Sequence, residues 1–471
     1  MSRRVDVAII GAGTAGLSAL ALVQRSTQDF VLINEGAYGT TCARVGCMPS
    51  KALIEAARAL HAGRHYHESG MGAPARLRVD LPAVLQHVRE IRDGLVQGVL
   101  KLTENLGERN VAGRARFVAP DAVEVNGERI EARRIVIATG SRPIVPDAWR
   151  ALGSRVLTTD DLFEQRSLPR RIAVVGLGAV GAEMAQALAW LGLEISAFDA
   201  ATRVAGLSDP RVNEAAVAML SSELAVHLGA PAELAAKGKG IRVHAGDAVV
   251  DIDQVLVALG RRANVDDLGL ENLGVALDAH GTPLFDPRTM QIADLPVYIA
   301  GDADADAAIL HEAADEGWIA GYNAMREGPE CFERRPPVGI VFTDPEIAFV
   351  GQRFAEIAPA EAVIGEVNLA GQGRLRMSGR DRGLIRVYAE RTGGRILGAE
   401  LVAPGAEHLA HLLALAIQQH LTLTDLLRLP FYHPTVEEAL RSALRDAARQ
   451  LPGARAPDLA FCERPQAAAL D

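Results

Sequence analysis

Two cysteines, Cys42 and Cys47, stand five residues apart in the stretch TTCARVGCMPSK, which ends at Lys51. The run after it, to Leu60, is rich in Ala and Leu and predicts a helix. The cysteines therefore stand where a helix begins, and there the unpaired backbone N–H groups and the helix dipole favour a thiolate. Such a pair can close a small, reducible disulfide ring, which indicates redox chemistry. Two buried free cysteines are the alternative, and this stretch alone does not choose between the two interpretations.

The elements that position this pair begin with a glycine loop near the N-terminus. The β-branched run VDVAII leads into GAGTAG, a helical stretch and then the strand FVLINE, which ends at Glu35. This order of strand, glycine loop, helix and strand is typical of a dinucleotide-binding unit. Its glycines would permit the tight turn, the close approach of a pyrophosphate and the packing of helix on strand, in the order Gly11, Gly13 and Gly16. Glu35 is placed to accept hydrogen bonds from a ribose, and an exposed strand-end carboxylate is the alternative.

A second glycine loop repeats the first. RIAVVGLGAVGAE carries Gly176, Gly178 and Gly181, and the following strand ends at Asp199. The chain therefore contains an internal repeat of one nucleotide-binding fold, and two such sites beside a redox cysteine pair imply two carriers that exchange electrons. A carboxylate at Asp199 favours NAD over NADP, because it bonds a 2′-hydroxyl and repels a 2′-phosphate; Arg203, close by, argues in the opposite direction.

Buried strands also end at glycines outside the two loops. We expect these strand ends to line the cofactor sites, at Thr139 and Gly140 in IATG, at Gly260 in VALG, and at Gly301 and Asp302 in IAGD. An aspartate at a strand end, before a helix, suits a ribityl or pyrophosphate contact. Between the cysteine helix and IATG the sequence predicts a long helix from Leu81 to Leu106 and a hairpin turn at Asn126-Gly127.

The part after Pro336-Pro337 has a different pattern. Short strands (VGIVFT, IAFVGQ, LIRVYAE and ILGAELV) are followed by a helix from Ala406 to Gln419, which suits an antiparallel sheet covered by helices. His433 precedes Pro434 and so lies outside helical geometry, and Glu438 comes five residues later. A histidine with a carboxylate nearby can serve as a general base; a turn histidine and a solvated helix charge are the alternative. We expect the Pro- and Ala-rich tail after Gln450 to be loosely ordered.

Composition bounds the other possibilities. The formal net charge of −10, without a long Lys/Arg run, excludes a basic nucleic-acid surface. No apolar run approaches about 18 residues, so we expect no membrane span and, without a signal-peptide pattern, a cytoplasmic protein. The remaining cysteines, Cys331 and Cys462, do not form a secreted disulfide framework. We expect no metal site. Three histidines at helical spacing could mimic one, but we expect them to form a solvated helix face: His61, His65 and His67.

Taken in order, these motifs resemble the flavin-dependent pyridine nucleotide–disulfide oxidoreductases, and within that family the branch that oxidises dihydrolipoyl groups. The resemblance covers about the first 450 residues, and the cysteine segment is its most specific part. It implies an α/β fold with two Rossmann-like domains, for FAD and NAD, and a C-terminal α+β domain that forms a homodimer. The implied units are an FAD-binding domain, an NAD-binding domain, an FAD-binding return segment, a dimerisation domain and a tail, at 1–147, 148–264, 265–335, 336–450 and 451–471.

The same resemblance implies a role for each chemical group. Cys42 would exchange with substrate, and Cys47 would lie beside the flavin. Lys51 would sit near the flavin, paired with Glu183. His433, held by Glu438, would be the general base and would act in the active site of the other subunit.

Three functions remain under consideration. The first is oxidation by NAD⁺ of dihydrolipoyl groups, on a lipoyl-carrying protein or a small dithiol. The second is an NAD(P)H-dependent reductase of another disulfide or of a metal substrate; Asp199 argues against NADPH. The third is a catalytically idle flavoprotein with a structural or binding role, which has no need of an intact set of redox residues. Departures from the family lie at Phe431-Tyr432 before the histidine, at Ala179 in the second loop and at the single Cys462 of the tail.

Overall fold

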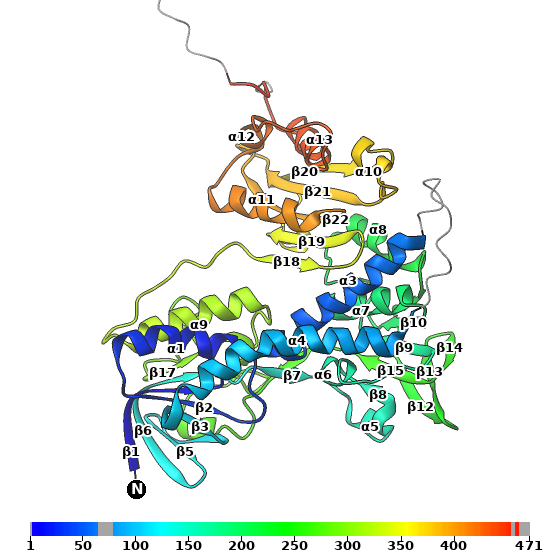
Figure 1. Ribbon diagram of the computed structural model, residues 1–471. Helices are drawn as coiled ribbons and strands as arrows, with labels where there is room; N and C mark the ends of the chain where they lie inside the picture. Colours follow the sequence, from blue (N-terminus) through cyan, green and yellow to red (C-terminus); the bar gives the residue numbers. More distant parts are fainter. Residues whose placement is uncertain (1, 65–78, 454–456, 461–471) are drawn as a thin grey trace, which may run out of the picture.

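The chain folds into three units, each built on its own sheet, and Figure 1 shows the first at lower left, the second at lower right and the third at the top. The structure is a computed structural model that describes residues 2–64, 79–453 and 457–460. None of the helices within these residues combines the length and the apolar character that a membrane crossing needs.

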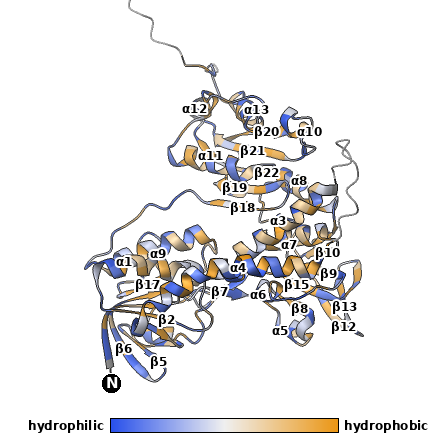
Figure 2. Cartoon of the chain, in the orientation of Figure 1, coloured by the Kyte–Doolittle hydropathy of each residue, from blue (hydrophilic) through white to orange (hydrophobic). Residues whose placement is uncertain are grey.

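The first sheet joins strands that lie far apart in the sequence. Its order is β3-β2-β1-β6-β5-β4, and β17 pairs parallel with the C-terminal half of β6. The bounds are β1 (Ser2–Ile10), β2 (Phe30–Asn34), β3 (Asn110–Ala112), β4 (Ala115–Ala119), β5 (Ala122–Val125), β6 (Glu128–Ile137) and β17 (Val297–Ile299). Asn126 and Gly127 connect β5 to β6 with φ of 53° and 80°, which confirms the predicted hairpin turn. Much of this hairpin is coloured hydrophilic in Figure 2, as is the beginning of β1.

Helices α1 (Thr14–Ser26) and α9 (Leu310–Ala324) cover one face of this sheet. Along β1 the side chains alternate, so that Val7 and Ile9 face these helices while Ala8 and Ile10 belong to the core on the other face. The two helices pack closely because α9 carries glycine at the contact: a Cβ atom on Gly317 would lie 2.1 Å from the Ala15 carbonyl oxygen.

The second sheet repeats this plan. Its order is β11-β10-β9-β15-β8, all parallel, with α7 (Ala179–Trp190) following the glycine loop and a three-stranded antiparallel sheet inserted before the last strand. The strands are β8 (Val156–Leu157), β9 (Arg171–Val175), β10 (Glu194–Asp199), β11 (Ala225–Leu228), β12 (Glu233–Lys237), β13 (Gly240–Ala245), β14 (Ala248–Ile252) and β15 (Gln254–Val257).

Two helices connect the first unit to the second. They are α3 (Cys47–Arg64) and α4 (Leu81–Glu104), which matches the predicted long helix to within two residues. Leu53 and Ala57 of α3 belong to the same buried cluster as Ala182 and Met184 of α7. The helix that begins at the redox cysteine is therefore anchored against the second nucleotide-binding unit.

The third unit is the predicted antiparallel sheet with helices. Its order is β18-β19-β22-β21-β20, and every neighbouring pair is antiparallel. The bounds are β18 (Val338–Val341), β19 (Glu346–Gly351), β20 (Ala362–Asn368), β21 (Leu384–Glu390), β22 (Ile396–Ala403), α11 (Ala406–Gln418), α12 (Leu423–Leu427) and α13 (Glu437–Ala448). Strand β20 was not predicted. In the described part of the tail, Asp458 is ion-paired with Arg445 at 2.7 Å.

Short elements complete the described chain. The remaining α-helices are α2 (Thr41–Arg44), α5 (Asp147–Arg150), α6 (Thr159–Leu162), α8 (Pro210–Ser221) and α10 (Gly373–Met377), and the strands β7 (Ser141–Pro143) and β16 (Arg261–Ala263) pair antiparallel; 3-10 turns make up the rest.

Candidate active site

The two cysteines lie in consecutive helices. Cys42 is in the one-turn helix α2, and Cys47 is the first residue of α3. The Thr40 side chain accepts a hydrogen bond from the Ala43 backbone N–H at 3.1 Å and so caps α2. Gly46 lets the two helices approach, because a Cβ atom there would lie 3.2 Å from the Cys42 Cα. Both thiols are free in this structure.

The pKa values of the two thiols are shifted in opposite directions. The Cys42 thiol donates a hydrogen bond to the Cys47 sulfur, and this bond, helped by the charge of Lys51 and opposed by burial, lowers the pKa of Cys47 to about 6. The same hydrogen bond, together with burial, raises the pKa of Cys42 far above its usual value. At neutral pH Cys47 is therefore a thiolate while Cys42 keeps its proton.

Lys51 and Glu183 form an ion pair behind the cysteines, in which the carboxylate is buried and the lysine is partly exposed. The Lys51 Nζ donates to both oxygens of Glu183 at 3.0 and 2.9 Å, and Glu183 is only 3% exposed. The carboxylate also accepts from the Phe342 backbone N–H at 2.9 Å, and Lys51 lies 4.6 Å from the centre of the Phe342 ring. Glu183 thus connects the cysteine helix, the second unit and the third unit, and it fixes the ammonium group near Cys47.

The first glycine loop meets its sheet without room for side chains. A Cβ atom would lie 2.1 Å from the Ala138 carbonyl oxygen at Gly11 and 1.9 Å from the Gly11 oxygen at Gly16. Gly11 also has a φ of +114°. A Cβ atom on Gly13 would meet nothing within 4 Å, so open space lies over the middle of the loop, where a phosphate can approach the backbone.

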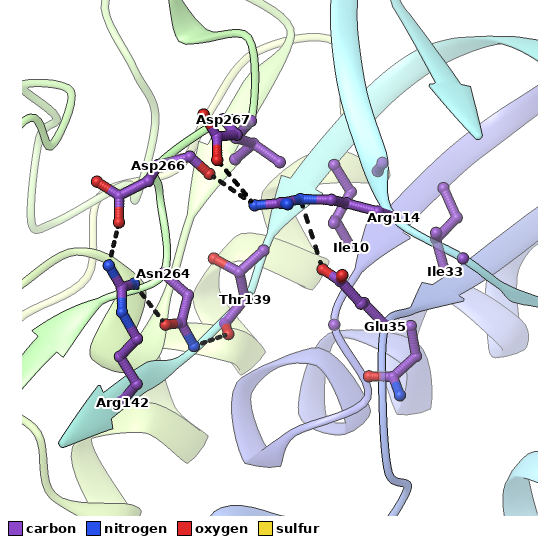
Figure 3. A pocket seen from close by; sticks show the side chains of 14 residues that line it. Ile10, Ile33, Glu35, Arg114, Thr139, Arg142, Asn264, Asp266 and Asp267 are labelled. Atoms are coloured by element: carbon purple, nitrogen blue, oxygen red, sulfur yellow. Dashed lines mark hydrogen bonds and ion pairs between the residues drawn. The ribbon is translucent and has the colours of Figure 1, made fainter. Parts of the chain in front are cut away.

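A cavity of about 420 Å³ opens at the end of this loop (Figure 3). Glu35 lines it, with its carboxylate 3.6 Å from Arg114, and Arg114 in turn lies 3.3 Å from Asp267. The Thr139 Oγ1 is buried without a hydrogen-bond partner among the described residues, which leaves a donor and acceptor available to a ligand. The open space over Gly13 and the unpaired buried hydroxyl of Thr139 both fit a bound dinucleotide.

The ends of β6 and β17 lie close together beyond the cavity. Gly301 has a φ of +68°, and its N–H donates to the buried Glu316 at 2.8 Å. Asp302 accepts a hydrogen bond from the Ser141 hydroxyl, which comes directly after Gly140. The ends of β6 and β17 therefore present Gly140 and Asp302 side by side, next to the first glycine loop.

The second glycine loop has the same geometry. A Cβ atom would lie 2.3 Å from the Ala258 oxygen at Gly176 and 1.8 Å from the Gly176 oxygen at Gly181, whereas at Gly178 it would meet nothing within 4 Å. Asp199 accepts hydrogen bonds from two backbone N–H groups, of Leu177 at 2.6 Å and of Ala201 at 2.8 Å.

The other features of this unit also lie near the loop. Gly260, with a φ of +95°, ends the segment after β15 and accepts a hydrogen bond from the Ile144 N–H at 3.0 Å. Ala179 and Arg203 are both exposed. Because the N–H groups of Leu177 and Ala201 both donate to it, the Asp199 carboxylate has a fixed orientation at the end of β10.

His433 and Glu438 form the predicted pair. The His433 Nδ1 lies 3.0 Å from a Glu438 oxygen, and this hydrogen bond holds the pKa of Glu438 below its usual value. The histidine side chain is 80% exposed. Figure 1 draws α13, which carries Glu438, above the sheet of the third unit and α3, which carries Cys47, below it. Within one chain the His433–Glu438 pair therefore lies away from the cysteines.

A metal site finds no support in the described residues. No group of three His, Cys, Asp or Glu side chains among them could hold an ion. The ring of His61 stacks on Trp190 with a centroid distance of 4.0 Å, which is a packing contact rather than the predicted solvated face. His65, His67 and Cys462 lie outside the described residues.

Three residues of the site were not singled out from the sequence. Asn34, not Glu35, is the last residue of β2, and its Oδ1 accepts from the Ala12 N–H at 3.0 Å. Arg114 and Phe342 come from segments far away in the chain. Only the position of Asn34 could have been found from the sequence, by aligning the two glycine-loop units residue by residue.

Comparison with known proteins agrees with this geometry. The profile described as pyridine nucleotide-disulphide oxidoreductase matches residues 5–328, and that of the family's dimerisation domain matches residues 338–444. The chain is 32% identical to a dihydrolipoyl dehydrogenase of Haloferax volcanii, over 94% of this chain and 96% of the relative. It is 28% identical to a mercuric reductase of Staphylococcus aureus, over 93% of this chain and 81% of the relative.

Solved structures give the same result for the fold. The Cu(II) complex of an HOCl-induced flavoprotein disulfide reductase, RclA of Escherichia coli, superposes with a TM-score of 0.82 at 22% identity, covering 94% of this chain and 99% of that one. LpdA of Mycobacterium tuberculosis superposes with a TM-score of 0.78 at 25% identity, with the same coverage. The predicted fold class is therefore confirmed, with two nucleotide-binding units and a dimerisation domain. The chain belongs to the pyridine nucleotide–disulphide oxidoreductases, a family of flavoproteins that uses FAD and NAD(P).

Proposed function

We propose that a dimer of this chain oxidises dihydrolipoyl groups with NAD⁺ through the Cys42–Cys47 pair. The observation that carries the proposal is the division of proton and charge between the two sulfurs, with Cys47 a thiolate beside Lys51 at neutral pH. Relatives named dihydrolipoyl dehydrogenase, at 32% identity in Haloferax volcanii and 29% in Bacillus subtilis, support the choice of substrate.

The oxidised pair would react by two thiol–disulfide exchanges. A substrate thiolate attacks the Cys42 sulfur, the Cys42–Cys47 bond breaks, and Cys47 leaves as a thiolate. The second substrate thiol then displaces Cys42, so that the substrate closes its own disulfide and Cys42 takes a proton. The substrate thereby loses two electrons to the cysteine pair. A sulfur with a pKa of about 6 is a good leaving group, which suits Cys47 to the first step.

The proton of the attacking thiol needs an acceptor near Cys42. His433 of the partner subunit would take it, with Glu438 holding the imidazole in place. Within one chain the sheet of the third unit lies between α13 and α3, which supports a site completed by a second copy. The dimerisation domain at residues 338–444 supports this arrangement.

The cofactor sites divide between the two glycine-loop units. FAD would be held by the first loop, Glu35 or its neighbour Asn34, Thr139, Gly140, Gly301 and Asp302, and NAD by the second loop, Asp199 and Gly260. When bound, the flavin supplies a two-electron carrier between the dithiol and the nicotinamide. This chain's own residues supply the phosphate cradles and the fixed charge of Lys51.

A second candidate is a reductase of another disulfide or of a metal ion. The 28% identity to a mercuric reductase over nearly the whole chain favours it, as does the residue before the catalytic histidine, Tyr432, which is 79% exposed and free to contact a different substrate.

The deciding experiment is the steady-state rate of NAD⁺ reduction by dihydrolipoamide, with NADP⁺ measured in parallel. We expect fast turnover with NAD⁺ and little with NADP⁺. An absence of turnover, with the flavin still reduced by NADH, would reject the dihydrolipoyl substrate and favour the second candidate.

The dimeric site has its own test in mixed dimers. Cys47→Ser and His433→Gln should each be inactive, but their co-expression should restore about a quarter of the activity, because half of the dimers then contain one intact site of two. No recovery in purified mixed dimers would contradict a site shared between subunits.

A further inference from the structure

The ends of β2 and β10 occupy equivalent places in the two glycine-loop units. The Gly11 N–H donates to the Ile33 carbonyl at 2.7 Å, and the Gly176 N–H donates to the Phe198 carbonyl at 2.8 Å. The residue after this carbonyl is Asn34 in the first unit and Asp199 in the second. Asn34 is thus the counterpart of Asp199.

The side chains of the two counterparts make the same contact. Asn34 accepts from the N–H of Ala12 at 3.0 Å, and Asp199 accepts from the N–H of Leu177 at 2.6 Å. In each case the donor is the residue after the first glycine of the loop. Glu35, one residue further on, corresponds to Ala200, and among the described residues its carboxylate contacts Arg114 rather than a backbone N–H of the loop.

Glu35 has a different partner. Its carboxylate is 64% exposed and lies 3.6 Å from the Arg114 guanidinium, which also lies 3.3 Å from Asp267. In Figure 3 Arg114 extends between Glu35 and Asp267, across the cavity. The three residues come from the loop after β2, the turn between β3 and β4, and the segment that returns to the first unit.

We propose that Asn34 binds the ribose of the FAD adenosine and that Glu35, instead of binding the ribose, holds Arg114 across the mouth of the pocket. The Asn34 Oδ1 is fixed by Ala12, and its amide donates weakly to the Gly36 carbonyl at 3.4 Å, which leaves a second N–H for a ribose hydroxyl. The position of Asn34 beside Gly11 is that of a ribose-binding residue in this fold.

A neutral residue at position 34 should weaken the retention of FAD. A neutral amide binds a hydroxyl less strongly than a carboxylate does, because hydrogen bonds to charged groups are about twice as strong as neutral ones. The exposed ion pairs of Arg114 are weak and are screened by salt. FAD should therefore leave this enzyme faster than it would with a carboxylate at position 34. This inference concerns the FAD site alone and holds whichever dithiol or disulfide the enzyme uses.

The test is the rate of FAD release from the holoenzyme, followed by the rise in flavin fluorescence after dilution, at about 20 mM and about 500 mM salt. Asn34→Asp should slow release about fivefold at both salt concentrations, because it gains a charged hydrogen bond of the kind that Asp199 can offer. Glu35→Gln should speed release by no more than about fivefold at low salt and have no effect at high salt.

Each outcome decides the assignment. Slower release from Asn34→Asp, with a salt-dependent effect of Glu35→Gln, supports the proposal. If Asn34→Asp leaves release unchanged or faster, Asn34 does not bind the ribose. If Glu35→Gln speeds release more than about tenfold at both salt concentrations, Glu35 is the ribose ligand, because a screened surface pair cannot account for an effect of that size. Both substitutions are close to isosteric, so the fold is not at risk.

Discussion

The first glycine of each nucleotide-binding unit meets its sheet in the same way. A Cβ atom would lie 2.1 Å from the Ala138 oxygen at Gly11 and 2.3 Å from the Ala258 oxygen at Gly176, and φ is positive at both, +114° and +96°. Such close agreement between segments 165 residues apart (176 minus 11) results from one requirement, which is a turn tight enough to aim backbone N–H groups at a phosphate.

The two units differ beyond their second strand. In the first, β2 ends at the neutral Asn34, and the chain enters the cysteine helices α2 and α3 within a few residues. In the second, β10 ends at the charged Asp199 and leads through an exposed loop to α8. One backbone frame thus serves two purposes: the first unit attaches the redox pair, while the second offers only a nucleotide site. The difference depends on a few residues at strand ends, so single substitutions can test it.

The largest effect should come from the chemistry that only the first unit carries. Cys47→Ser removes the thiolate that the Cys42 hydrogen bond stabilises, and we expect dithiol-driven reduction of NAD⁺ to fall by at least about 10³-fold, with FAD still bound. The measurement is steady-state turnover together with the flavin absorbance. Cys331→Ser, at an exposed free cysteine, is the matched control and should leave turnover unchanged. Near-normal turnover of Cys47→Ser would exclude the pair from the reaction.

Substituting the first glycine of one loop should disrupt the cofactor site of that unit and leave the site of the other unit intact. In Gly176→Ala the added Cβ meets the Ala258 oxygen at 2.3 Å in a backbone conformation that alanine disfavours, so NADH affinity should fall at least about 100-fold while FAD stays bound. Gly11→Ala should show the reverse, with loss of FAD on gel filtration. Gly94→Ala on α4, where a Cβ meets nothing within 4 Å, is the control. Loss of both cofactors from either variant would show that the loops are not independent.

The strand-end carboxylate should set the choice of nicotinamide cofactor. Asp199→Asn gives the second unit the same residue that the first unit has at Asn34, with the hydrogen bond from Leu177 preserved. Without the charge that repels a 2′-phosphate, the ratio of kcat/KM for NAD⁺ to that for NADP⁺ should fall about tenfold. The two ratios are measured side by side under identical salt conditions. An unchanged ratio would remove Asp199 from the ribose site and leave Arg203 as the residue to examine.

The sequence predicted the parts of the site that depend on local spacing. Glycines at fixed intervals between a strand and a helix, and cysteines before an Ala-rich run, define their own geometry, so Gly11, Gly176 and Cys47 lie where expected. The end of β2 was misplaced by one residue, at Glu35, because strand ends are not marked sharply in a sequence and an acidic residue there is the usual signal. One residue of shift moves a side chain to the opposite face of a strand.

Contacts between distant segments could not be predicted at all. The contact of Phe342 with Glu183 and the ion pair of Arg114 with Glu35 join residues 159 and 79 positions apart (342 minus 183, and 114 minus 35), and no local pattern indicates them. Strand β20 was missed because its glycine and polar residues interrupt the alternation of apolar and polar residues that indicates a strand. Gly365 is required there, since a Cβ atom would lie 1.9 Å from the Ala443 oxygen of α13. Such residues are chosen by tertiary packing rather than by propensity.

The smallest expected effect concerns a buried carboxyl pair that the first unit has and the second lacks. After β17, Asp304 and Glu316 are both buried, and burial together with the charge of Glu316 raises the pKa of Asp304 to about 8. The charged neighbours include the buried Glu312, Arg334, which pairs with Glu312 and Glu316, and the exposed Asp306, whose charge also raises the pKa of Asp304. After β8, the strand in the corresponding edge position, Asp161 instead caps α6 at the surface.

This difference should appear in the pH dependence of stability. Between about pH 4 and about pH 8 the folded protein binds a proton on Asp304 that the unfolded chain does not, so this group's contribution to stability falls as the pH rises through that range. Asp304→Asn, which mimics the protonated form and keeps the oxygen that accepts from the Asp306 N–H, should raise the Tm of the holoenzyme more at about pH 8 than at about pH 5. Asp306→Asn, which removes only the weaker charge effect of an exposed neighbour, should give a smaller pH-dependent gain. An equal gain at both pH values would mean that Asp304 is ionised in the folded protein, and the two units would then not differ in buried protons at this edge.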